Sequence, residues 1–444
     1  MTGRPPSGDG GGPLDVVLRA GRAVVLGADG VEVERPAAVG VRDGRVAVVA
    51  DAAAPLDAVR EVVVPDGVVL LPGLVDTHVH LQDPGHPGWE DFTSGTAAAA
   101  LGGVTTVVDM PLDCDPVTVD PAALAVKVAA ATGRVHVDVG FWAGLTPDSL
   151  PLLGDLLAAG ALGAKCFLVD PGTPGFAPLT AAGLEAGLAA ARALGAVVLV
   201  HAEDAGPPLE DAAVARVVEA VARTGGRAHV VHVSSASAAA LVAAAKARGL
   251  PVTAETCPHY LVLAAEDVPA TATGFDPRFT VAPPLRERAH AAALWEALRA
   301  GTLDLVVSDH SPGGDDGGPP GIASVQLGLP LVWTAARPRG VALTDVVRWM
   351  CRAPAALAGL SGRKGVIAPG ADGDLCLFAP DRQAVVDPRA LAQRRPDTPY
   401  TGRELTGVVT GTWLAGRPVD VRGRPRGQVL LARPRHPRPH RKES

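Results

Sequence analysis

The sequence predicts an α/β protein in which a (β/α)8 TIM barrel carries a small β-sandwich domain built from N- and C-terminal segments. In the middle of the 444-residue chain, apolar strand candidates alternate with Ala- and Leu-rich helical stretches. Repeated strand-then-helix units are typical of parallel strands joined by helical crossovers. Val-rich strand patterns with Gly and Asp turns occur before and after this region. The length suffices for a large barrel plus a smaller unit.

Eight strand candidates define the expected barrel. They are Leu74–Val79, Val104–Met110, Val135–Phe141, Ala161–Val169, Val197–Ala202, Ala228–Val233, Val252–Thr256 and Asp304–Ser308. Eight such units over roughly 250 residues are typical of this fold, whose active site lies at the C-terminal ends of the strands. Polar residues at the strand ends are therefore candidate site residues.

The flanking β segments are expected to form one unit. Strands are predicted in Leu14–Val25, Ala38–Val49, Val62–Val69, Asp374–Phe378 and Leu405–Leu414. We therefore assign residues 14–70 and 365–425 to the two parts of the β-sandwich and residues 71–360 to the barrel. Residues 1–13 are predicted to be a disordered tail, and residues 426–444 a basic, Pro-rich, solvated tail.

Composition narrows the class of protein. With 40 basic and 47 acidic residues, a net charge of −7, the chain has no basic footprint for nucleic acid. No apolar run has membrane-spanning length, and the N-terminus has no signal-peptide core, so we expect a cytoplasmic protein. The five cysteines form no Cys-x-x-Cys pair and are expected to be reduced and structural: Cys114, Cys166, Cys257, Cys351 and Cys376.

His78 and His80 stand two residues apart at the end of an apolar run. Because side chains alternate faces along a strand, both can point the same way and meet one cation. The pair therefore indicates half of a metal site, although one histidine could instead be a hydrogen-bonded core residue and the other exposed. The spacing alone does not identify the metal.

Further candidates stand at the ends of later strands: Lys165, His201, His232 and Asp309. A lone ammonium in the apolar surroundings of Lys165 would be unfavourable without a partner. His229 and His232 face opposite sides of their strand, as do Asp309 and His310, and we choose His232 and Asp309 as the inward members. Four histidines, a lysine and an aspartate at strand ends are hard to assign to packing alone.

The chain resembles the amidohydrolase superfamily, in the branch of cyclic-amide hydrolases that contains dihydroorotases, hydantoinases or dihydropyrimidinases, and allantoinases. The resemblance covers residues from about 14 to 420. It is carried by Pro72–His80, Gly163–Lys165, His201–Glu203, His232–Ser235, Cys257–Tyr260 and Ser308–Pro312. The allantoinase family is most similar in Asp109–Leu112, Gly140–Leu145, Lys165–Leu168 and Gly321–Pro330.

Several positions bear on the substrate. Dihydroorotases that resemble this chain hold the substrate carboxylate with an Arg and an Asn where Gln82 and Leu112 stand here, so dihydroorotate is disfavoured. Pro171-Gly172 replaces the Ser-Gly pair usual in allantoinases, and the segment 313–320 is shorter than in the family. Hydrolysis of another cyclic ureide or imide, as by hydantoinases and dihydropyrimidinases, is the alternative; a non-catalytic scaffold of the same fold is a third reading.

The resemblance also implies a mechanism, in which allantoin is opened to allantoate in purine and ureide catabolism. One metal is expected on His78, His80 and Asp309 and a second on His201 and His232, with an N-carboxylated, CO2-derived Lys165 bridging them. Zinc is expected, with manganese or cobalt as alternatives. A bridging hydroxide would attack the ring carbonyl, and Asp309 would move the proton to the leaving nitrogen.

The resemblance suggests, more weakly, three substrate contacts at Ala282, Ile322 and His259. The expected partner is a small cyclic ureide, with neither nucleic acid nor membrane. Relatives commonly form tetramers, so a homotetramer is expected.

Overall fold

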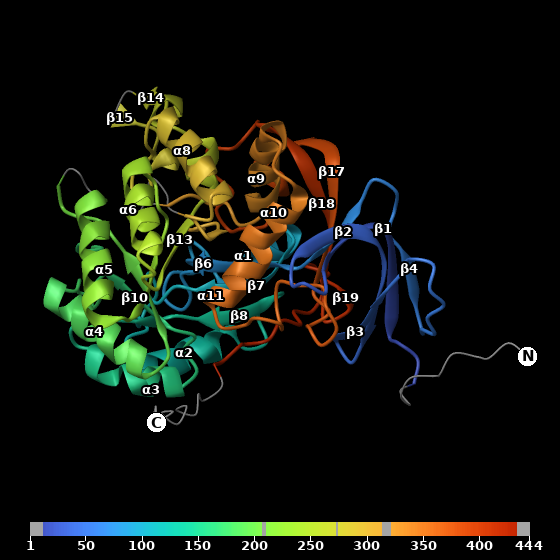
Figure 1. The fold of residues 1–444 in the computed structure, drawn as a ribbon, viewed down its shortest axis with the longest axis horizontal. Helices are drawn as coiled ribbons and strands as arrows, with labels where there is room; N and C mark the ends of the chain where they lie inside the picture. Colours follow the sequence, from blue (N-terminus) through green and yellow to red (C-terminus); the bar gives the residue numbers. More distant parts are fainter. Residues whose placement is uncertain (1–11, 207–209, 272–273, 313–320, 433–444) are drawn as a thin grey trace, which may run out of the picture.

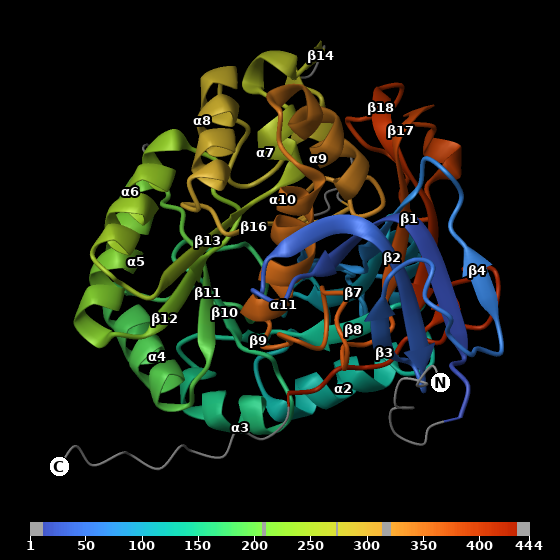
Figure 2. The ribbon, with the colours of Figure 1, turned by 45° about the vertical axis from the view of Figure 1, so that its right-hand side comes forward.

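The computed structural model describes residues 12–206, 210–271, 274–312 and 321–432. Its central element is a barrel of parallel strands (Figures 1 and 2), made of β6 (Leu74–Val79), β7 (Val104–Asp109), β8 (Asp138–Phe141), β10 (Ala164–Phe167), β11 (Val197–His201), β12 (Arg227–Val230), β13 (Val252–Thr256) and β16 (Leu305–Val306). The short β9 (Ala143–Gly144) joins β8 to β10. Beyond β16, the His80 amide donates to the His310 carbonyl at 2.7 Å and closes the barrel.

Helices follow most strands and form the outer ring, clearest in Figure 2 for α2 to α6 and α8. They are α1 (Phe92–Leu101), α2 (Pro121–Ala131), α3 (Leu153–Ala158), α4 (Ala181–Ala193), α5 (Asp211–Thr224), α6 (Ala236–Ala247), α7 (Pro258–Val262), α8 (Arg288–Arg299), α9 (Gly328–Ala336), α10 (Leu343–Val347) and α11 (Ala353–Leu357). Several helices begin with a side chain that accepts hydrogen bonds from the otherwise unpaired amides of the first turn. At α1, Asp91 accepts from the amides of Thr93 and Ser94.

A second sheet combines strands from both ends of the chain. Its order is β19-β18-β17-β5-β1-β2-β3, with β4 paired to β1. The strands are β1 (Val16–Leu26), β2 (Glu32–Arg42), β3 (Arg45–Ala50), β4 (Glu61–Val63), β5 (Val69–Pro72), β17 (Leu375–Val385), β18 (Glu404–Leu414) and β19 (Arg417–Pro418). The two halves meet where β5 pairs with β1 and β17. The predicted fold class is confirmed; the exact domain limits remain predictions.

Gly73 connects this sheet to the barrel. It stands alone between β5 and β6, and its amide donates to the Asp374 carbonyl at 2.8 Å. A Cβ at this position would collide with the side chain of Thr105 on β7. A residue without a side chain therefore allows the two sheets to approach closely here.

A buried ion cluster also ties the two units together. Lys364 Nζ lies 2.6 Å from a carboxylate oxygen of Asp138 on β8, 2.6 Å from one of Asp374 and 2.9 Å from one of Asp372. Burial alone would lower the pKa of Lys364, but the three carboxylates raise it above its usual value. Lys364 is therefore charged, and its contacts bridge the barrel and the segment that leads into β17.

Part of the predicted C-terminal tail is in contact with the barrel. Residues 427–432 run beside β8, where the Val139 amide donates to Gln428 and the Leu430 amide donates to Val139. Residues 1–11, the segment 313–320 and the tail from 433 onward lie outside the described residues, so our expectations for them stay predictions. Among the helices described, none is both long and apolar enough to cross a membrane.

Candidate metal centre

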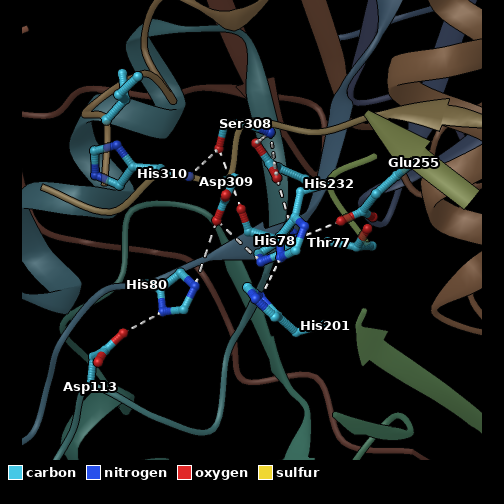
Figure 3. Close-up of polar contacts among 12 residues, drawn as sticks. Thr77, His78, His80, Asp113, His201, His232, Glu255, Ser308, Asp309 and His310 are labelled. Atoms are coloured by element: carbon cyan, nitrogen blue, oxygen red, sulfur yellow. Dashed lines mark hydrogen bonds and ion pairs between the residues drawn. The ribbon is translucent and has the colours of Figure 1, made fainter. Parts of the chain in front are cut away.

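The six predicted ligands come together at the C-terminal mouth of the barrel. His78 lies in β6, Lys165 in β10 and His201 at the end of β11, while the other three stand just beyond their strands. All six are buried and line one cavity of about 350 Å³: His78, His80, Lys165, His201, His232 and Asp309. Figure 3 shows the four histidines grouped around Asp309. The structure thus brings together side chains that are up to 231 positions apart (309 − 78).

His78 and His80 present the same ring nitrogen to Asp309. Their Nε2 atoms lie 3.2 and 3.7 Å from Asp309 Oδ1. Their Nδ1 atoms instead face carboxylates, Glu255 Oε1 at 2.5 Å for His78 and Asp113 Oδ2 at 2.8 Å for His80. At His78 this contact is a hydrogen bond, which fixes the ring and leaves Nε2 with a free lone pair, the usual arrangement behind metal-bound histidines. At His80 the carboxylate is close, but Nδ1 has no hydrogen-bond partner among the described residues. These three side chains form a cation-binding group.

His201 and His232 form a second group beside the first. His201 Nδ1 lies 2.8 Å from His232 Nε2, and His201 Nε2 lies 2.9 Å from Glu203 Oε2. The ring of His232 is 5.4 Å from that of His78, centre to centre. Burial, reinforced by His201 and Lys165, holds the pKa of His232 well below its usual value. A neutral imidazole is the form that can ligate a metal.

Lys165 stands between the two groups without a carboxylate partner among the described residues. Its ammonium nitrogen lies 4.9 Å from the centre of the Phe167 ring. Burial lowers the pKa of Lys165 to about 8, although Asp309 and Glu255 act in the opposite direction. At pH 7 about one tenth of the Lys165 side chain is therefore a neutral, nucleophilic amine, far more than for an exposed lysine.

Two of the candidates hold unusual backbone conformations. His232 has φ of 40° and Asp309 has φ of 47°, in the left-handed region that non-glycine residues rarely adopt. His232 stands two residues beyond the end of β12, and Asp309 three residues beyond the end of β16. Such strain persists only where the surrounding structure enforces it, and it is concentrated at functional sites.

Strand alternation holds for His310 but not for His229. The register aligns His229 with Leu199 and Lys165, so it lies on the inner face of the barrel, where its Nε2 is 2.9 Å from Glu255 Oε2. His232 turns inward only because its backbone, with φ of 40°, leaves the strand. His310 turns toward Glu90, at 3.3 Å, and accepts from the Ser324 amide. Neither side chain lines the cavity.

The weaker substrate candidates are more scattered. Ala282 lines the cavity, as does Leu112. Ile322 is buried and pairs with His310 through the backbone, and His259 is fully buried; neither lines the cavity. Gln82 is likewise buried beside the site rather than lining it. Substrate roles for Ala282, Ile322 and His259 stay predictions.

Glu255 and Asp113 are functional candidates that our sequence reasoning missed. Glu255 is buried on β13 and joins His78 to His229, and Asp113 faces His80. Burial would raise the pKa of Glu255, but the two histidines lower it to about 2. An acidic residue inside a predicted barrel strand, Val252–Thr256, was the signal available for Glu255, because a buried charge requires a partner.

Comparison with known proteins gives a consistent assignment. Residues 69–419 match the amidohydrolase family model. The chain is 42% identical to an allantoinase from Streptomyces avermitilis, over 95% of this chain and 99% of that one, and 39% identical to an allantoinase from Saccharomyces cerevisiae, over 82% and 86%. Among solved structures, an L-hydantoinase (dihydropyrimidinase) from Arthrobacter aurescens superposes with a TM-score of 0.85 at 27% identity, covering 94% of this chain and 100% of that one. The chain belongs to the amidohydrolase family.

Proposed function

We propose that this protein is a metal-dependent hydrolase that opens the cyclic amide of allantoin to give allantoate. The observation that carries the proposal is the convergence of four histidines, Lys165 and Asp309 on one buried cavity. The curated relatives with 42% and 39% identity are allantoinases, which supports this substrate class. The proposal places the protein in purine and ureide catabolism.

The donor set fits two divalent cations. His78, His80 and Asp309 would hold one, and His201 and His232 the other, while a carboxylated Lys165 would offer one oxygen to each. Two cations bound here would lower the pKa of a water molecule and polarise the ring carbonyl. Imidazole-rich ligation favours zinc, with manganese or cobalt as alternatives.

Lys165 is suited to carboxylation. A neutral amine attacks CO2, a C–N bond forms, and one proton is released to give an anionic carbamate. The pKa of about 8 that burial imposes on Lys165 supplies the neutral amine. The modification also removes the repulsion between an ammonium group and two dications.

Asp309 is the proposed proton carrier. Burial would raise its pKa, but the facing His78 and His80 lower it, so the carboxylate is ionised and ready to accept a proton. In the proposed reaction a carboxylate oxygen of Asp309 accepts the proton of the attacking water. It then delivers this proton to the leaving ring nitrogen as the C–N bond breaks.

The cavity favours a neutral ring over an anionic one. Among the residues that line it are Leu112, Asp113 and Asp170, and no arginine lines it in the described part of the chain. A substrate carboxylate would therefore lack its natural guanidinium partner. This supports allantoin over dihydroorotate, while hydantoinase-like hydrolysis of another cyclic ureide is the alternative, in keeping with the L-hydantoinase superposition.

A panel of rings tests the substrate. We expect kcat/KM for allantoin to exceed that for hydantoin, dihydrouracil and dihydroorotate, because discrimination reflects differential binding of the transition state. A preference of about tenfold for hydantoin or dihydrouracil, about 1.4 kcal/mol, would refute the allantoin assignment. Cyclic-amide hydrolysis itself would then still stand.

The remaining parts of the proposal are a cytoplasmic location and a homotetramer. Five free cysteines, all buried, are in keeping with a reducing compartment. Light scattering of the purified protein measures the assembly directly, and a monomer in solution would contradict the tetramer.

A further inference from the structure

A second group of potential metal ligands, outside the cavity, includes Asp309. A sulfur of Cys257, a ring nitrogen of His259 and a carboxylate oxygen of Asp309 all lie within 4.8 Å of one another, and all three residues are buried. Cys257 is the N-cap residue of α7 and His259 lies in the first turn of this short helix. Cys257 has no role in the proposed function, and His259, for which we predicted a substrate contact, does not line the cavity.

The imidazole of His259 lacks the contacts that a buried polar ring normally has. Both ring nitrogens are buried without a hydrogen-bond partner among the described residues. The His259 ring packs against the Tyr260 ring, at 4.2 Å between centres. Buried polar groups are normally satisfied, and an exception calls for a missing ligand or a functional role. Here the nearby donors are a thiol and a carboxylate, which together with imidazole make a metal-ligand set.

We propose that Cys257, His259 and Asp309 form an inhibitory site for a thiophilic divalent cation such as Zn²⁺ or Cd²⁺. Thiolate and imidazole select soft or borderline cations over Mg²⁺ and Ca²⁺. A thiolate and a carboxylate together neutralise a dication, which permits its burial. The metal–sulfur bond forms as the thiol releases its proton, so the step needs no oxidant.

Asp309 links this site to catalysis. The cation would reach Asp309 through the cavity that this residue lines. Cys257 and His259, which lie next to Asp309 but do not line the cavity, would complete the coordination. Asp309 is also the proposed ligand of a resident cation; once its second carboxylate oxygen is bound to the inhibitory cation, the carboxylate can no longer carry a proton to the leaving group. The inhibition therefore rests on the proposed function of Asp309, whereas cation binding does not.

The test is a Cd²⁺ titration of the metal-loaded enzyme, followed by ultraviolet absorption and by residual activity. The wild type is expected to bind one equivalent beyond its resident metals, to develop a thiolate-to-cadmium charge-transfer band and to lose at least tenfold in rate. Cys257→Ser should retain basal activity and lose both the band and the inhibition. Cys351→Ser, a buried free thiol on a different part of the barrel, is the matched control and should behave as wild type.

Each other outcome counts against the proposal. A wild type without the band, or a band that persists in Cys257→Ser, overturns the site. A band without inhibition overturns its inhibitory role. Because Cys257→Ser could fail to fold, His259→Asn provides a second variant and should weaken Cd²⁺ binding at least tenfold. The band is measured without substrate, so a failure of the allantoin assignment leaves this part of the test intact.

Discussion

Replacing Lys364 by methionine should destabilise the protein strongly while leaving the chemistry intact. The Lys364 ammonium lies within 2.9 Å of Asp138, Asp372 and Asp374, and the lysine is buried. Methionine keeps most of the volume but removes the counter-charge of the buried Asp138 and Asp374, whereas Asp372 keeps its ion pair with Arg363. Removing one partner of a buried ion pair costs about 3–5 kcal/mol, and we expect a loss in this range.

The loss should depend on pH. Burial raises the pKa of Asp374 to about 6, against the pull of Lys364. Below that pH this carboxyl is protonated and no longer needs the ammonium, so the difference between variant and wild type should shrink on going from pH 8 to pH 5. Urea denaturation at both pH values measures it, with initial rates at 25 °C as the check that the site is intact.

Lys246→Met is the matched control. This lysine lies 2.6 Å from Asp304, but both side chains are partly exposed. Solvent-screened pairs of this kind are worth at most about 1 kcal/mol. If Lys364→Met loses no more stability than Lys246→Met, or if its loss does not depend on pH, the buried ion cluster does not stabilise the contact between the barrel and the second sheet.

Three further substitutions test the site and its supports. Lys165→Ala should lose metal and activity together, with partial rescue of both by short carboxylic acids; bare lysine in the mass of active, metal-loaded enzyme would rule out carboxylation. Glu255→Gln removes the charge that hydrogen-bonds to His78 and His229 and should lower metal affinity by about 10–100-fold. Competition with a chromophoric chelator measures this affinity, and an unchanged value would show that Glu255 does not support the metal ligands. Asp91→Ala removes the N-terminal cap of α1 and should cost about 1 kcal/mol in urea denaturation; an unchanged midpoint would contradict that role.

The barrel was predictable because its strands are buried on both faces. Parallel strands covered by helices are near-continuous apolar runs, as in Val197–His201, and each of the eight candidates overlaps an observed strand. Strand alternation also separates Asp309 from His310, but it does not place His232, which enters the site through a left-handed backbone beyond the end of β12. The ends of the strands were less predictable. The predicted strand Ala161–Val169, for example, contains only the short β10, Ala164–Phe167.

The supporting carboxylates were not predictable in the same way. Glu255 meets His78 across 177 positions, and no periodicity specifies which strand-borne acid contacts which histidine. Asp113 depends on a left-handed backbone conformation, φ of 56°, that an aspartate adopts only in context. The contacts of residues 427–432 with β8 could not be predicted either. A basic, Pro-rich composition does not show that the backbone of β8 has groups free to bond with this segment.

Metal content measured against allantoin hydrolysis tests the central claim most directly. Protein purified without chelator should contain close to two equivalents of a divalent ion per chain. Removing the metal should abolish hydrolysis, and stepwise reloading should restore the rate only as the second equivalent binds, because both histidine groups must be filled. A fully metal-free protein that still opens allantoin would contradict the account.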